Sequence, residues 1–362
     1  MRGRDLGIEV GRGRPGPINA ITDVPGVRVG FLTLVEGDGP LVVGEGPVRT
    51  GVTVIVPHDG NVWEEPLFAG AHRLNGNGEL TGLEWIRESG MLTSLVGLTN
   101  THSVGVVRDA LAAIDVRERS NPGQPFWALP VVGETWDGVL NDVNGMHVRT
   151  EHVLAAYEAA AGGPVDEGNV GSGTGMICHG FKGGIGTSSR VVEAVGGATV
   201  GVLVQANHGR RERLRINGVA VGEAIPASEV PEPGVDGSGS IIAIVATDAP
   251  LLPVQCSRLA QRVGLGIARV GGVGENSSGD IFLAFTTGNR GLPPSEGDAS
   301  GPLTVPVEML SNLYITHLFD AVVEATEEAI VNALFAAETM TGKGGTTVYA
   351  LPIERTVELL KS

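Results

Sequence analysis

The chain has 362 residues, of which 42% are hydrophobic and 18% charged, a composition typical of a soluble globular protein. Its 41 acidic and 25 basic residues give a formal net charge of −16, which argues against nucleic acid and anionic membranes as partners. No apolar run approaches the length of a bilayer-spanning helix, and no apolar signal segment follows the N-terminal arginines, so we expect a cytoplasmic protein. The two cysteines, Cys178 and Cys256, are far apart and indicate reduced core thiols rather than metal ligands.

The first half of the chain mixes short apolar strands with short helices. After a turn at Pro25-Gly26 that leads into a strand, further strands are predicted at residues 51–57, 92–98 and 128–132. Helical patterns are predicted at residues 83–88, 106–116 and 151–161.

Two polar stretches in this half are candidates for a pocket wall. The Gly/Asn-rich segment 69–82 contains His72, Asn75, Asn77 and Glu79, which either line a pocket or cap turns. The strand at 128–132 runs into Glu134 and Trp136, which would share one face if the strand continued.

Residues 168–209 form the part of the chain that is richest in glycine. Gly171, Gly173 and Gly175 lack the spacing of a dinucleotide fingerprint, so strands at 191–195 and 199–205 in a stacked sheet fit better than a nucleotide loop. Asn207 leaves the second of these strands, where it is either a turn residue or an oxyanion donor. An Asn217-Gly218 hairpin follows.

The junction at Ser240 dominates the second half. An acidic Pro/Gly-rich run ends at Gly239, and Ser240 opens a β-branched run typical of a buried strand. Ser240 is either a turn serine or the nucleophile of a self-cleaving precursor, because glycine has no Cβ to block attack on its carbonyl. Cleavage would give Ser240 a free α-amine that titrates near roughly pH 7.7–8 and can serve as the general base.

The chain beyond Ser240 has a clearer pattern. Pro253 opens an amphipathic helix with Cys256, Leu259, Val263 and Ile267 on one face. A polar turn then precedes a strand, and two helical stretches end the chain; the predicted elements are a strand at 281–285, a helix at 307–339, a segment at 348–351 and a final short helix. Separate blocks of strands and helices indicate layered sheets with helices outside.

Several motifs together resemble the L-aminopeptidase/D-Ala-esterase/amidase family of the DmpA type, which includes β-peptidyl aminopeptidases. They span nearly the whole chain in order, at residues 21–30, 173–178, 180–186, 239–242, 246–251, 278–281 and 337–341.

This resemblance implies an αββα sandwich in a single domain over residues 1–362. It also implies cleavage between Gly239 and Ser240 into subunits 1–239 and 240–362, of 239 and 123 residues (362 minus 239), which stay associated as a homo-oligomer, usually a tetramer of such pairs. Ser238 also follows a glycine, but Ser240 abuts the strand as the motif requires.

The resemblance also assigns roles to individual residues. Ser240 looks like the nucleophile and Asn207 like the oxyanion donor. Ser278 and Asp280 look like the proton-handling pair, and Glu134 would bind the substrate's free ammonium. No metal or organic cofactor is expected for acyl-enzyme chemistry of this kind.

Two positions depart from the family pattern. Some members carry tyrosine where this chain has Trp136, so the phenolic donor is absent, and some carry glutamate where it has Asp280. The expected function is therefore a self-processing serine aminopeptidase that acts on short peptides, amides or esters. Two alternatives remain: a related amidase for a pantetheine-like amide, and an unprocessed, non-catalytic binding protein.

Overall fold

Two β-sheets stacked face to face form the centre of the molecule. The computed structural model describes residues 1–121, 123, 126–234, 239–294 and 301–361. The first sheet has the order β1-β2-β5-β6 and consists of Arg28–Glu36, Val48–Val56, Val96–Asn100 and Val131–Thr135. The second has the order β4-β3-β12-β11-β10-β9 and consists of Met91–Leu92, Leu67–Arg73, Asp280–Thr286, Ser240–Thr247, Ala198–Asn207 and Gly184–Val192.

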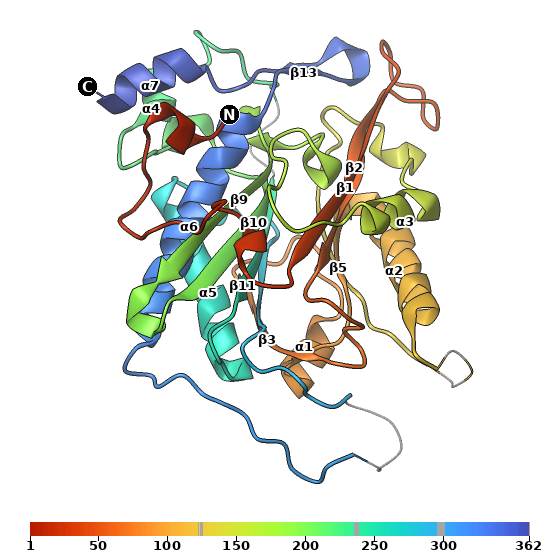
Figure 1. Cartoon of the computed structure of the whole chain (residues 1–362). Helices are drawn as coiled ribbons and strands as arrows, with labels where there is room; N and C mark the ends of the chain where they lie inside the picture. The colour runs from red at the N-terminus through yellow and green to blue at the C-terminus, as the bar shows by residue number, and fades with distance from the viewer. Residues whose placement is uncertain (122, 124–125, 235–238, 295–300, 362) are drawn as a thin grey trace.

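Helices cover the outer face of each sheet, so the architecture is the expected αββα sandwich (Figure 1). Helices α2 (Val104–Glu118) and α3 (Thr150–Glu158) pack on the four-stranded sheet. Helices α5 (Pro253–Arg269) and α6 (Ile315–Ala336) pack on the six-stranded sheet. None of the described helices has both the length and the hydropathy that crossing a bilayer requires.

Smaller elements complete the chain. The short helices are α1 (Leu83–Ser89), α4 (Val221–Ala224) and α7 (Ile353–Lys361). Two small hairpins pair β7 (Ile177–Cys178) with β8 (Phe181–Lys182) and β13 (Met340–Thr341) with β14 (Thr347–Val348).

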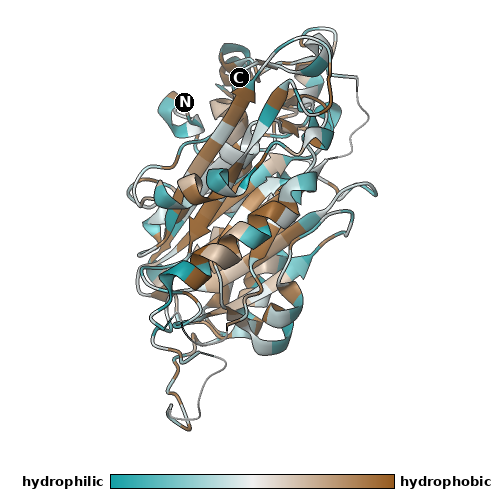
Figure 2. Cartoon of the chain, turned by 90° about the vertical axis from the view of Figure 1, so that its right-hand side faces the viewer, coloured by the Kyte–Doolittle hydropathy of each residue, from teal (hydrophilic) through white to brown (hydrophobic). Residues whose placement is uncertain are grey.

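Alternation along the central strands divides the interior into two apolar layers, and Figure 2 shows hydrophobic colouring along these strands. Along β11, Ile241, Ala243 and Val245 belong to the cluster under α5 and α6, whereas Ile242 and Ile244 belong to the cluster between the sheets. Ser240 has the parity of Ile242, so its side chain lies on the face between the sheets.

Most predicted elements are confirmed to within a few residues. The predicted α5 face is buried at all four of its named positions, and both cysteines are free and buried. The Asn217-Gly218 turn has φ values of 51° and 80° and joins a bridge between Ile216 and Val219.

Four predictions about strands were wrong in detail. The loop expected from residue 69 begins as β3, which pairs with β12, and the strand expected at 92–98 is two strands in different sheets. The strand expected at 128–132 starts three residues later, as β6. The strand expected at 191–195 lies earlier in the chain, as β9. The glycines of β9 let it pack closely against α6, because a Cβ at Gly186 would lie 1.9 Å from the Ala329 oxygen of that helix.

The long helix expected at 307–339 is also shorter than predicted. It begins at Ile315, because the backbone before it is bonded to other parts of the molecule. The Leu310 N–H donates to the Pro250 oxygen at 2.7 Å, and the Leu310 oxygen accepts from Gln255 Nε2 at 2.8 Å. These tertiary bonds replace the helical ones.

Candidate active site

Ser240 is the first residue of β11 and lies directly opposite Asn207, the last residue of β10. The Ser240 side chain is largely buried, with 7% of the residue exposed, and its Oγ accepts the Gly279 N–H at 2.9 Å. The hydroxyl is therefore held in place by a backbone donor from the neighbouring strand entrance.

Gly239 is in a position that no other residue can occupy without rearrangement. A Cβ added there would lie 1.8 Å from the backbone oxygen of Asn207. Steric contact, rather than a left-handed backbone, therefore requires glycine before Ser240. Ser238, the other serine considered at this junction, lies outside the described residues.

Asn207 has an amide side chain fixed at both ends. Its Oδ1 accepts the Ile177 N–H at 2.7 Å, and its Nδ2 donates to the Trp136 oxygen at 3.0 Å. A primary amide has two N–H donors, so one remains for a group bound at Ser240.

The glycine-rich segment before β9 holds Ile177, whose N–H donates to the Asn207 side chain, in place. Its glycines are buried by close packing, as at Gly175, where a Cβ would lie 2.4 Å from the Arg49 oxygen. Lys182 closes the segment by donating to the oxygens of Gly173, Met176 and Gly183. The segment therefore positions Ile177 and does not present an open phosphate loop.

Ser278 and Asp280 form a buried hydrogen-bonded pair. Ser278 Oγ donates to Asp280 Oδ1 at 2.6 Å, and the same oxygen accepts the Ile241 N–H at 3.2 Å. Asn75 holds the other side, because its Nδ2 donates to Asp280 Oδ2 at 3.1 Å and its Oδ1 accepts the Asp280 N–H at 2.6 Å. Burial raises the pKa of Asp280, while the hydrogen bonds from Ser278, Ile241 and Asn75 oppose the shift.

Glu134 reaches the site from the opposite sheet. It lies on β6 with only 3% of the residue exposed; its Oε1 accepts the Glu79 N–H at 2.9 Å and its Oε2 accepts the Thr101 hydroxyl. Burial raises the pKa of Glu134, and the charge of Glu79 adds to the shift, while the bonds from Thr101 and the Glu79 N–H oppose it. Trp136, just beyond β6, is 36% exposed.

A pocket of about 400 Å³ joins residues from both sheets. Its lining residues are Asn77, Gly78, Glu79, Thr101, Glu134, Trp136, Ser240 and Ser277. Among the predicted site residues, Ser240, Glu134 and Trp136 line this pocket. The other predicted residues do not line this pocket. Asn207 is the strand partner of Ser240, and Ser278 and Asp280 flank Gly279, whose N–H donates to Ser240 Oγ. Asp280 also accepts the N–H of Ile241, the residue after Ser240.

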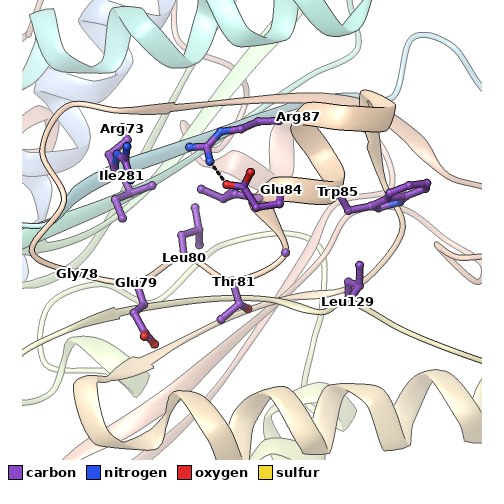
Figure 3. A pocket seen from close by; sticks show the side chains of 12 residues that line it. Arg73, Gly78, Glu79, Leu80, Thr81, Glu84, Trp85, Arg87, Leu129 and Ile281 are labelled. Atoms are coloured by element: carbon purple, nitrogen blue, oxygen red, sulfur yellow. Dashed lines mark hydrogen bonds and ion pairs between the residues drawn. The ribbon is translucent and has the colours of Figure 1, made fainter.

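A second pocket, of about 410 Å³, adjoins the first at Gly78 and Glu79 (Figure 3). It contains Arg73 and the Glu84–Arg87 ion pair. Figure 3 shows Glu79 pointing away from these groups.

Sequence reasoning missed two residues of the site and left others undecided. Thr101 and Gly279 were not singled out, although Thr101 follows β5, the parallel neighbour of β6, and the carboxyl ends of parallel strands meet at one edge. The segment with Asn75 and Glu79 was left between a pocket wall and a turn, and it is a pocket wall.

Comparison with known proteins places this geometry in a family. The model of peptidase family S58 matches residues 19–348. The chain is 49% identical to the β-peptidyl aminopeptidase BapA of Sphingosinicella microcystinivorans, over 99% of this chain and 92% of that protein. It is 44% identical to the BapA of Sphingosinicella xenopeptidilytica, over 100% of this chain and 91% of that protein.

Solved structures agree with the family match. A β-aminopeptidase of Burkholderia sp. superposes with a TM-score of 0.93 at 55% identity, covering 100% of this chain and 98% of that one. The L-aminopeptidase D-Ala-esterase/amidase of Ochrobactrum anthropi, a prototype serine aminopeptidase with a variant Ntn-hydrolase fold, superposes with a TM-score of 0.90 at 44% identity, covering 99% and 98%. The chain therefore belongs to peptidase family S58 and is a serine-type aminopeptidase with the DmpA-like variant of the Ntn-hydrolase fold.

Proposed function

We propose that this aminopeptidase activates itself by cleaving its own Gly239–Ser240 bond. The Ser240 hydroxyl adds to the Gly239 carbonyl carbon and the peptide C–N bond breaks, which leaves an ester and a free Ser240 amine. Water then hydrolyses the ester and yields subunits 1–239 and 240–362 of one domain. The absence of room for a Cβ at Gly239 and the buried, hydrogen-bonded Ser240 hydroxyl support this step.

The processed enzyme then uses Ser240 as both nucleophile and base. The Ser240 amine takes the hydroxyl proton, Oγ attacks the substrate carbonyl, and the same proton passes to the departing amine or alcohol. Water resolves the acyl-enzyme and releases the N-terminal residue. These steps use only the Ser240 α-amine, side chains and water, and they need no metal or organic cofactor.

Asn207 and the Ser278–Asp280 pair are the proposed supporting groups. Asn207 is paired directly with Ser240, and the N–H of its amide that is not bonded to Trp136 is the proposed donor to the tetrahedral oxyanion. Ser278 donates to Asp280 at 2.6 Å and forms with it the proposed proton-handling pair. Asp280 also accepts the Ile241 N–H, and Gly279, between the two residues of the pair, donates its N–H to Ser240 Oγ.

Glu134 is the proposed partner of the substrate's ammonium, and this contact makes the enzyme an exopeptidase. A buried carboxylate in the same pocket as the nucleophile is the single observation that carries this assignment. The indole of Trp136, which lines the same pocket, offers a cation–π face to that ammonium.

The substrates proposed are short peptides, amides and esters with a free N-terminal amine, and β-aminoacyl groups are the first class to test. The support is the name of the two BapA relatives, which are 49% and 44% identical to this chain over nearly its whole length.

The test compares β-alanyl and alanyl p-nitroanilides with their N-acetylated forms. We expect kcat/KM to fall at least about 100-fold on acetylation, because the buried Glu134 loses its charged partner. Equal turnover of free and acetylated forms contradicts amine recognition and favours the alternative of a pantetheine-like amidase. No turnover, together with a single uncleaved chain, favours the alternative of a binding protein.

We also propose a cytoplasmic homo-oligomer of processed pairs, a tetramer in the simplest case. Two buried free cysteines are consistent with a reducing compartment. The segment before α6, which Figure 1 shows extending below the sheets, exposes large apolar side chains that a neighbouring copy would cover: Leu303, Val307, Met309, Leu313 and Tyr314. Light scattering should give the mass of several pairs, and Leu313→Glu should lower it; a monomeric pair in both cases contradicts this proposal.

A further inference from the structure

The catalytic pocket contains two carboxylates, Glu79 and Glu134. Of the eight residues that line it, none is lysine, arginine or histidine. The two acids are adjacent across the backbone, because the Glu79 N–H donates to Glu134 Oε1 and the Glu134 N–H donates to the Glu79 oxygen at 3.3 Å. A like-charged pair of this kind is complementary to a cation.

The two carboxylates differ in how far the protein itself satisfies them. Each oxygen of Glu134 already accepts a hydrogen bond, from Glu79 and from Thr101. The exposed side chain of Glu79 makes no hydrogen bond or ion pair with any residue in the described part of the chain. Its carboxylate points away from Arg73 and the Glu84–Arg87 pair, the cations of the adjoining pocket (Figure 3).

An ammonium group has three N–H donors in a tetrahedral arrangement. Glu134 alone cannot accept all three, because both of its oxygens already accept a hydrogen bond from the protein. We infer that Glu79 is a second substrate-binding carboxylate, which holds the substrate's N-terminal ammonium together with Glu134. This inference rests on the proposed function and extends it: the pocket would bind the amine between two acids.

The same arrangement has an electrostatic consequence in the free enzyme. Glu79 is one of the causes that raise the pKa of Glu134. A bound ammonium relieves this repulsion as well as forming new hydrogen bonds, so part of the binding preference for a cation comes from Glu79.

The test is the Glu79→Gln variant, which keeps the backbone N–H that anchors Glu134 and removes only the charge. We use n-butylammonium as a competitive probe and n-butanol as its neutral counterpart, together with β-alanyl p-nitroanilide as substrate. We expect Ki for butylammonium and KM for the substrate to rise about three- to five-fold, the scale of a partly exposed ion pair. We expect kcat and the effect of butanol to change little.

A pH series adds a readout that a merely structural role would not move. Removing the neighbouring charge lowers the pKa of Glu134, so the acidic weakening of butylammonium binding should occur at lower pH in Glu79→Gln. Glu79→Asp keeps the charge and should keep the unmutated pH dependence. Glu84→Gln is the matched control, because that acid pairs with Arg87 outside the catalytic pocket.

Each outcome decides a different point. Unchanged Ki for butylammonium in Glu79→Gln, or equal losses for butylammonium and butanol, overturns the role of Glu79 and leaves the proposed function intact. An unmutated enzyme that turns over free and acetylated substrates equally overturns both.

Discussion

Ser278 Oγ donates to Asp280 Oδ1 across 2.6 Å, and that same oxygen accepts the N–H of Ile241, the residue after the proposed nucleophile. One carboxylate therefore connects a buried hydroxyl on the turn before β12 to the first residues of β11. The shorter side chain of aspartate suffices here because β11 and β12 are adjacent parallel strands, with Ile241 paired directly to Asp280.

The Ser278–Asp280 pair should be required for catalysis. Ser278→Ala and Asp280→Asn should each lower kcat roughly 100-fold or more, the usual scale for a proton-transfer group. Ser277→Ala is the matched control, because Ser277 lines the pocket but its side chain makes no hydrogen bond to Asp280 in the described part of the chain. Steady-state kinetics on processed protein measures the effect; near-unmutated kcat in both variants would make the pair structural.

Self-processing should depend on the absence of a side chain at Gly239. Gly239→Ala places a Cβ 1.8 Å from the Asn207 oxygen, so the junction must shift and cleavage should slow or stop. Gly105→Ala is the control, since a Cβ there meets nothing within 4 Å. Intact mass should show two chains meeting between Gly239 and Ser240 in the control and one chain in Ser240→Ala. A junction at Ser238, or an active but uncleaved enzyme, contradicts the processing scheme.

Glu134→Gln should weaken the use of substrates with a free amine. We expect kcat/KM to fall roughly 10- to 100-fold for β-alanyl p-nitroanilide, the scale of a lost charged hydrogen bond, and to change little for the acetylated form. In the unmutated enzyme Glu134 must be ionised, and its pKa is raised by burial, so amine binding should weaken as pH falls through that raised value. Inhibition by butylammonium as a function of pH measures this directly, and a pH-independent Ki would rule out Glu134 as the ionising group.

A buried acid far from the site should make stability depend on pH. Asp115 on α2 is 4% exposed, its Oδ2 has no partner in the described part of the chain, and burial raises its pKa to about 7. Its ordinary pKa is 3.8. Between pH 3.8 and about 7 the folded state binds more protons than the unfolded state. The contribution of Asp115 to the free energy of unfolding therefore falls as pH rises through this range, and the fall is complete above about pH 7.

The variant Asp115→Asn removes that titration. The stability that the variant gains over the unmutated protein should be larger at pH 8 than at pH 5, by roughly 3 kcal/mol for the two pH units between pH 5 and the raised pKa of about 7. Urea unfolding at both pH values checks this result. Asp109→Asn, on the exposed side of the same helix, should show no such difference.

The sequence by itself determined what is local. A glycine followed by Ser240 and a β-branched run predicts a strand with a hydroxyl at its first residue, and the apolar period after Pro253 predicts helix α5 with its buried face. The separate blocks of strands and helices predicted layered sheets with helices outside, and the resemblance of the ordered motifs to the family implied the αββα sandwich. The strand β11 and the helix α5 could be predicted because each depends on the pattern of residues that are close together in the sequence.

Only the tertiary structure decided which distant groups meet. Asn207 lies opposite Ser240 because β10 and β11 pair in one register, and a shift by one residue would turn its amide to the other face. Glu134 and Thr101 belong to the other sheet, and Asn75 and Glu79 reach the site on a segment that crosses between the sheets. The loss of a predicted helical start before Ile315 has the same origin, since tertiary hydrogen bonds to that backbone outweigh its local helical preference.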